Sequence, residues 1–122
     1  MIINFLRTYK FSILFLFIIT LLMIIPGKSI PSELIIFNGV DFVVHILLFG
    51  FLTVLYLFEK RSDKSVLLTI TTFITTIVIY SLMIEIIQHF LIPGRTGSYF
   101  DFTANIIGLS LLFLKKFFPV KS

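Results

Sequence analysis

The chain has 122 residues, a mean hydropathy of +1.13 and a net charge of +4; 58% of its residues are hydrophobic and 13% are charged. A water-soluble domain of this size has too little interior to bury so much apolar surface, so the composition excludes an ordinary soluble protein and predicts a single membrane domain over residues 1–122. Cysteine is absent, which excludes disulfides and thiolate sites, and the basic excess is assigned to the flanks of membrane segments rather than to nucleic-acid binding.

Four apolar segments follow one another along the chain. We expect helices at about residues 9–25, 41–58, 66–91 and 101–118. Each segment reaches the lower limit of roughly 17 residues for a helix that crosses the hydrocarbon core. The apolar runs are continuous and lack the alternation typical of strands. The sequence therefore predicts an all-α membrane protein, built as a four-transmembrane-helix bundle.

Basic residues are distributed unevenly between the two sides of these helices. The arm before the first helix carries two lysines or arginines, the loop after the second carries three and the tail carries three, whereas the other two loops carry one each. The positive-inside rule then places both termini in the cytoplasm and the loops 26–40 and 92–100 outside. Arg7 and Lys10 resemble the start of a signal peptide, but residues 26–29 do not form a small-x-small cleavage site, so we expect an uncleaved first helix.

The residues able to do chemistry gather at the outer ends of the helices. They are Asp41 and His45 on the second helix, Glu85, Gln88 and His89 on the third, Arg95 in the loop that follows, and Asp101 and Asn105 on the fourth. Polar groups at membrane depth are costly, so a convergent set of them predicts a functional site. Helical spacing places them on three stripes, which we expect to face one outward-opening pocket. Ala104 and Gly108 form a small-xxx-small pair that lets a neighbouring helix approach closely.

Glu85 is the member of this set that is hardest to explain by structure alone. It lies six residues before the end of the third helix, which is roughly 9 Å inside that end. A carboxylate facing lipid there would be costly, so we expect it to face the bundle, either paired with Arg95 or His45 or protonated. The other residues have structural alternatives: Asp41 and Asp101 as helix N-caps, and the remainder as interfacial anchors or interhelical hydrogen bonds.

Three blocks of this sequence resemble the VanZ-like family of small bacterial membrane proteins. They are D-F-V-V-H at residues 41–45, E-I-I-Q at 85–88 and P-G-R-T-G-S-Y-F-D-F-T-A-N-I-I-G at 93–108. The resemblance covers about residues 41–114. It implies a multi-pass protein of the bacterial cytoplasmic membrane, in a family whose founding member is linked to low-level resistance to the glycopeptide teicoplanin. Phe42 stands where we take the family pattern to have a lysine, which removes one positive charge beside the predicted pocket.

Three classes of function remain open. In the first, the pocket binds or handles an envelope lipid or a lipoglycopeptide-related ligand, with Arg95 holding a phosphate. A divalent cation on oxygen and imidazole ligands is an option within this class, and the candidate ligands are Asp41, His45, Glu85 and Asp101. An enzyme would use His45 or Glu85 as general base, but no recognised catalytic motif is present, so we do not expect catalysis.

The second class is a structural or partner-binding protein, in which Glu85, Arg95 and the aspartates form a buried ionic network. The third is a proton-coupled transporter subunit, in which Glu85 and His89 relay protons. No other cofactor is expected, the bilayer is the one certain partner implied by composition, and an oligomer is left open.

Overall fold

The structure is a computed structural model that describes residues 2–34, 39–61, 70–95 and 98–119. Its helices are α1 (Ile2–Thr8), α2 (Lys10–Met23), α3 (Val40–Lys60), α4 (Ile70–Leu91) and α5 (Tyr99–Leu109), with the 3-10 segments η1 (Gly27–Ser29), η2 (Ser32–Leu34) and η3 (Ser110–Phe117). The described residues contain no strand, which confirms the all-α prediction for this part of the chain.

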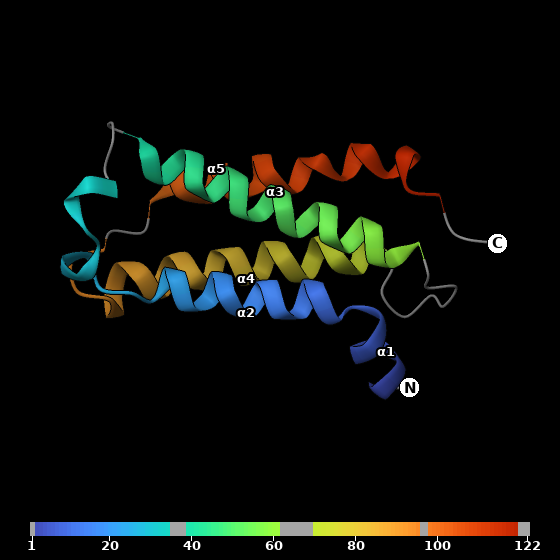
Figure 1. The fold of residues 1–122 in the computed structure, drawn as a ribbon. Coiled ribbons are helices and arrows are strands. Elements are labelled where there is room, and N and C mark those ends of the chain that lie inside the picture. The colour runs from blue at the N-terminus through green and yellow to red at the C-terminus, as the bar shows by residue number, and fades with distance from the viewer. Residues whose placement is uncertain (1, 35–38, 62–69, 96–97, 120–122) are drawn as a thin grey trace.

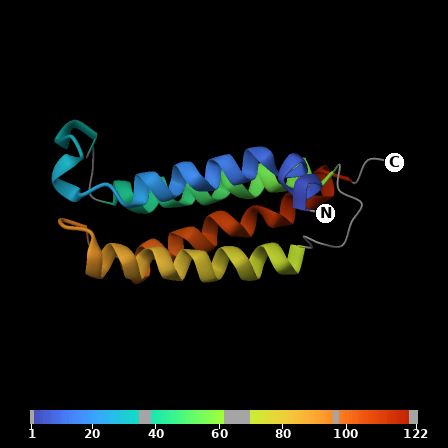
Figure 2. The same ribbon diagram turned by 90° about the horizontal axis from the view of Figure 1, so that it is seen from below.

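Helices α2 to α5 lie side by side and run alternately in opposite directions (Figure 1). Helix α3 packs against α2 and α5, and α4 packs against the same two helices, so the cross-section is a square with α3 and α4 on one diagonal. Figure 2 shows the two layers of this arrangement, with α2 above α3 in one and α5 beside α4 in the other. We call the end where α2 and α4 finish and α3 and α5 begin the polar end.

Two of the helices, α3 with 21 residues and α4 with 22, are long and apolar enough to cross a membrane. Helices α1 and α2 make a third span only if the pair counts as one segment, because they are bent by 76° at a break next to Tyr9. The break falls at the start of the first predicted segment, so α1 precedes that segment and α2 occupies 14 of its residues. The fourth is 11 residues of α5 followed by 8 residues of η3. Residues 66–69, predicted to begin the third helix, lie outside the described residues.

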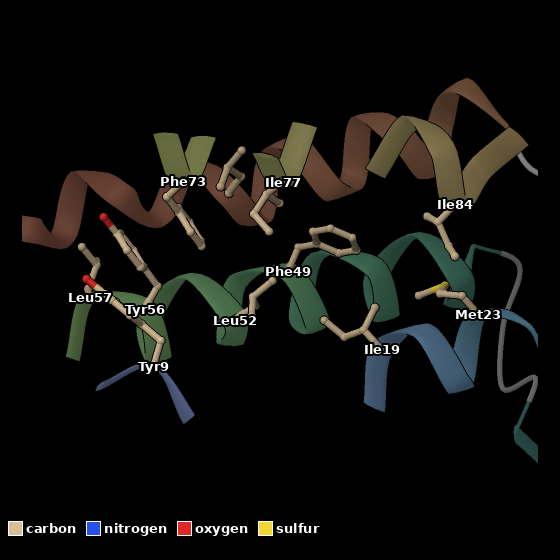
Figure 3. Close-up of a cluster of buried hydrophobic side chains, with 11 residues drawn as sticks. Tyr9, Ile19, Met23, Phe49, Leu52, Tyr56, Leu57, Phe73, Ile77 and Ile84 are labelled. Atoms are coloured by element: carbon tan, nitrogen blue, oxygen red, sulfur yellow. The ribbon is translucent and has the colours of Figure 1, made fainter. Parts of the chain in front are cut away.

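The core between the helices is aromatic and aliphatic (Figure 3). The rings of Tyr56 and Phe73 stack with centroids 3.8 Å apart, and the Tyr9 ring lies 5.9 Å from that of Tyr56. The outward faces are apolar as well: Leu47 on α3 is 65% exposed and Met83 on α4 is 57% exposed. Exposed apolar side chains on this scale are typical of a surface that contacts lipid.

Glu59, near the end of α3, explains where α2 begins. Its buried carboxylate accepts hydrogen bonds from the backbone N–H groups of Phe11 and Ser12, at 2.7 and 3.0 Å, and from the Ser12 hydroxyl. The first N–H groups of a helix have no partner within that helix and carry partial positive charge. A carboxylate from α3 therefore caps α2 and stabilises the break that separates it from α1. The sequence analysis assigned no role to Glu59.

Helices α3 and α5 are in backbone contact at Gly108. A Cβ atom built there would lie 2.7 Å from the backbone nitrogen of Gly50 and 2.7 Å from the backbone oxygen of Ile46. Real Cβ atoms do not approach other atoms so closely, so any side chain at Gly108 forces the two helices apart. Small residues allow this close approach, which brings the polar faces of α3 and α5 together.

We predict that Gly108→Ala lowers the free energy of unfolding by about 1–3 kcal/mol, because the added methyl group overpacks the contact between the two helices. The measurement is thermal or denaturant unfolding in detergent. Ser110→Ala is the matched control, since Ser110 is exposed and lies two residues further along the chain. Equal stability of the two variants would show that α3 and α5 do not touch at this position.

Candidate functional site

Polar side chains from three helices meet inside the polar end. His45 on α3, Glu85 on α4 and Asn105 on α5 are 2%, 6% and 1% exposed. His45 Nδ1 lies 2.7 Å from Asn105 Oδ1 and 3.5 Å from Glu85 Oε1. Asn105 Nδ2 donates to the Ser81 hydroxyl at 2.7 Å and to Glu85 Oε1 at 3.2 Å. We call these four residues the central network; it ties α3, α4 and α5 to one another.

The hydrogen bonds of this network determine which nitrogen of His45 carries a proton. Asn105 must turn its NH₂ group toward the Glu85 carboxylate, so its oxygen faces His45. That oxygen only accepts, so Nδ1 of His45 is the donor, and Nε2 of the neutral ring is an acceptor. Nε2 forms no hydrogen bond with the described residues and is not one of their fully buried unpartnered atoms. The free acceptor therefore reaches the space beside α3.

That space is a cleft of about 250 Å³ between α2 and α3. Its walls include the apolar side chains of Leu22, Ile25, Val44 and Leu48, and its polar lining includes Asp41, His45 and Arg95. We call it the α2–α3 cleft. The cleft combines an apolar wall with a few convergent polar groups, which is the usual composition of a small-molecule site.

A second cleft, of about 460 Å³, lies between α4 and α5 on the other side of the central network. Its walls are Leu82, Ile86, Phe90, Tyr99 and Phe102, and its polar lining is Glu85, His89 and Ser98. We call it the α4–α5 cleft. The central network thus forms a partition, because His45 lines one cleft and Glu85 lines the other.

The two oxygens of Glu85 differ in their surroundings. Oε1 interacts with His45 and Asn105, whereas Oε2 is fully buried and has no hydrogen-bond partner among the described residues. The backbone amide of Ser98 and the carboxylate of Asp101 both interact electrostatically with Glu85, but the amide does not reach hydrogen-bond geometry at Oε2. A buried acceptor without a partner is rare and costs about 1–3 kcal/mol. A donor from outside the described residues would therefore stabilise Oε2.

Five of the residues predicted to share one pocket lie in two adjoining locations. His45, Glu85 and Asn105 form the central network; Asp41, which is exposed, and Arg95, which is half-buried, line the α2–α3 cleft beside His45. The single predicted pocket is therefore two clefts separated by a hydrogen-bonded partition.

Gln88 and His89 lie apart from the network. Gln88 is buried, and its Nε2 donates to the backbone oxygen of Met23 at 3.0 Å, which joins the end of α4 to the end of α2. His89 is exposed and lines the α4–α5 cleft, with its ring in edge contact with Phe90 at 4.7 Å. Gln88 was predicted to line the pocket, but it is not among the lining residues of either cleft, and its amide holds the last turn of α2.

The structural alternatives for the two aspartates are wrong in detail. Gly39 is the N-cap of α3, and Asp41 lies inside the first turn. Ser98 is the N-cap of α5, and its hydroxyl accepts a hydrogen bond from the backbone N–H of Asp101 at 3.1 Å. Neither aspartate caps its helix, so both carboxylates remain available to the site.

Arg95 is a cation without a carboxylate partner among the described residues. Among the described residues, the side chain within ion-pair distance of Glu85 is His45 and not Arg95. The loop that carries Arg95 is held in place by its neighbour: Gly27 donates its backbone N–H to the oxygen of Pro93 at 2.9 Å, and Gly94 has φ of +73°. The two loops of the polar end are thus bonded to each other, which places Arg95 over the α2–α3 cleft.

The four candidate metal ligands do not converge. Asp41 and His45 line one cleft, Glu85 lines the other, and Asp101 lines neither but interacts electrostatically with Glu85. Within the described ranges, no group of three or more His, Cys, Asp or Glu residues is placed to hold a metal ion.

Comparison of the chain with models of known protein families, with curated proteins and with solved structures finds no match.

We predict that Asn105→Ala lowers the free energy of unfolding by about 2–3 kcal/mol. The substitution removes the amide N–H groups that donate to Ser81 and Glu85, and also the amide oxygen that accepts from His45. Denaturant unfolding in detergent is the measurement. Asn4→Ala, at an exposed position of α1, is the matched control and should change stability by less than about 0.5 kcal/mol. A loss no greater than that of the control would contradict the network.

Proposed function

We propose that this chain is a VanZ-like multi-pass protein of the bacterial cytoplasmic membrane that binds an amphiphilic envelope molecule in the α2–α3 cleft. The observation that carries the proposal is Arg95, a half-buried cation with no carboxylate partner among the described residues, at the mouth of a cleft with apolar walls. A guanidinium holds a phosphate through two parallel hydrogen bonds, and the apolar walls suit a hydrocarbon chain.

His45 supports the same ligand class. Its Nε2 accepts a hydrogen bond from the cleft side, so a head group with a hydroxyl beside its phosphate satisfies both His45 and Arg95. The blocks shared with VanZ-like proteins support a lipoglycopeptide-related ligand and a link to teicoplanin resistance. No reaction is proposed, because binding alone accounts for these groups.

The distribution of charge supports an orientation with the polar end outside the cell. The described basic residues at the opposite end of the bundle are Arg7, Lys10, Lys60, Arg61, Lys115 and Lys116. At the polar end the described residues contribute Lys28 and Arg95. The positive-inside rule then places the polar end outside and both termini in the cytoplasm.

The length of the last segment supports a fourth span. A 3-10 helix rises about 2.0 Å per residue against 1.5 Å for an α-helix, so α5 and η3 together reach about 32 Å. The hydrocarbon core is about 30 Å thick. The change to the steeper 3-10 geometry in η3 thus lets a segment of modest length cross the bilayer.

A structural role is the second candidate, and the central network favours it. Its hydrogen bonds join three helices, as expected of a group of residues retained to hold the bundle in one arrangement. The two candidates make different demands on Arg95, which takes no part in the network.

We predict that labelling of single introduced cysteines will show the polar end outside the cell. The chain has no cysteine of its own, so each variant carries one reactive thiol. Lys28→Cys should react with a membrane-impermeant maleimide on intact cells, and Arg61→Cys only after the membrane is permeabilised. The inverse pattern would place the polar end in the cytoplasm and remove the outer leaflet as the source of the ligand.

We predict that Arg95→Gln weakens binding of phosphatidylglycerol by about tenfold, which corresponds to the loss of one charge-assisted interaction. Native mass spectrometry of the purified protein measures the retained lipid, with diacylglycerol as the probe that lacks the phosphate. Lys28→Gln is the matched control, because Lys28 is an exposed cation on the adjoining loop. Equal retention by both variants, with no loss of stability in either, would favour the purely structural role.

A further inference from the structure

The α4–α5 cleft has an acceptor that the proposed phosphate site does not use. Glu85 Oε2 is fully buried and has no hydrogen-bond partner among the described residues, and Glu85, which is 6% exposed, lines this cleft. An uncharged hydroxyl or a charged N–H group from a ligand would each complete its hydrogen bonding. The choice between them depends on the charge around the cleft.

That charge is negative. Asp101 lies close enough to Glu85 to repel its carboxylate, and His45, whose Nδ1 lies 3.5 Å from Glu85 Oε1, is the one side chain of the described residues within ion-pair distance of it. Among the described residues, the lining of the cleft includes no lysine or arginine, and its titratable groups besides Glu85 are His89 and Tyr99. Arg95, the nearest cation along the chain, lines the opposite cleft. Two carboxylates facing one imidazole favour a cationic ligand over a neutral one.

The walls define the rest of the ligand. Leu82 and Ile86 are each 50% exposed on the face of α4, so the cleft is open along an apolar surface that suits a hydrocarbon chain. Phe90 and Tyr99, which are 75% and 92% exposed, place aromatic rings at its mouth. Aromatic faces attract ammonium groups, and rings of this kind are typical of the membrane interface.

We propose that the α4–α5 cleft binds an amphiphile through a primary ammonium head group, which donates a hydrogen bond to Glu85 Oε2 while its chain lies along Leu82 and Ile86. A primary ammonium has three N–H donors and is compact enough to approach a buried oxygen. A quaternary ammonium carries the same charge but has no N–H to donate. The cleft is therefore selective for primary over quaternary ammonium, and this site is separate from the phosphate site.

The test uses a fluorescent reporter in the cleft. The chain has no tryptophan, so Phe102→Trp supplies a single one in the cleft wall. The full chain in phosphatidylcholine nanodiscs is titrated with three dodecyl probes brominated on the chain, which differ only in having a primary ammonium, a trimethylammonium or a hydroxyl head. We expect half-maximal quenching at a mole fraction about tenfold lower for the primary ammonium than for the other two, as one charge-assisted hydrogen bond requires.

Variants assign this preference to Glu85. Glu85→Gln keeps the shape of the side chain and should abolish the tenfold preference, whereas Glu33→Gln, an exposed carboxylate at the same end, should leave it intact. If Glu85→Gln does not fold, Asp101→Asn tests the same charge from outside the network and should reduce the preference about threefold.

Equal quenching by the three probes, or a preference that persists in both Glu85→Gln and Asp101→Asn, would overturn the proposal. Arg95→Gln should leave the ammonium preference unchanged. The proposal of an ammonium site and the proposal of a phosphate site can therefore be contradicted independently of each other.

Discussion

The hydrogen bond from His45 Nδ1 to Asn105 Oδ1 is the interaction on which the polar end depends. It forms because Glu85 Oε1 accepts an N–H of the Asn105 amide, which turns the amide oxygen toward His45. As a result, His45 Nε2 faces the α2–α3 cleft as an acceptor. Glu85 Oε2, beside the α4–α5 cleft, has no partner among the described residues. One bond between α3 and α5 thus determines which group each cleft presents to a ligand.

Each end of the bundle contains a buried carboxylate, and the two differ in how their oxygens are hydrogen-bonded. Glu59 accepts three hydrogen bonds at the first turn of α2, so both of its oxygens are satisfied. Glu85 has one satisfied oxygen and one without a partner in the described residues. Because an unpaired buried acceptor costs free energy, the Glu59 arrangement is explained by structure alone, whereas Glu85 Oε2 is left open to a donor from outside the described residues. The same chain therefore contains its own example of a carboxylate with a purely structural role.

Part of the site could be predicted from residue spacing and the cost of polar groups in lipid. Both considerations predict that Glu85 faces the bundle, where the structure places it, near His45 and Asn105. The division into two clefts could not be predicted, because helical periodicity assigns a residue to a face but not to one side of a neighbouring helix. Ser81 and Glu59 were missed as partners for a related reason: each bonds to a residue on another helix, at sequence separations of 24 and 47 or 48.

By itself, the sequence determined the class of structure: continuous apolar runs in a chain of this composition form helices in lipid, and α3 and α4 end within a few residues of their predicted bounds. Tertiary structure alone decided the break at Tyr9, the cap supplied by Glu59 and the contact of α3 with α5 at Gly108. The physical reason is that helix formation depends on hydrogen bonds between residues four apart, so a pattern of neighbouring residues in the sequence predicts it. Caps, close backbone contacts and buried networks depend on groups that only the folded chain brings together.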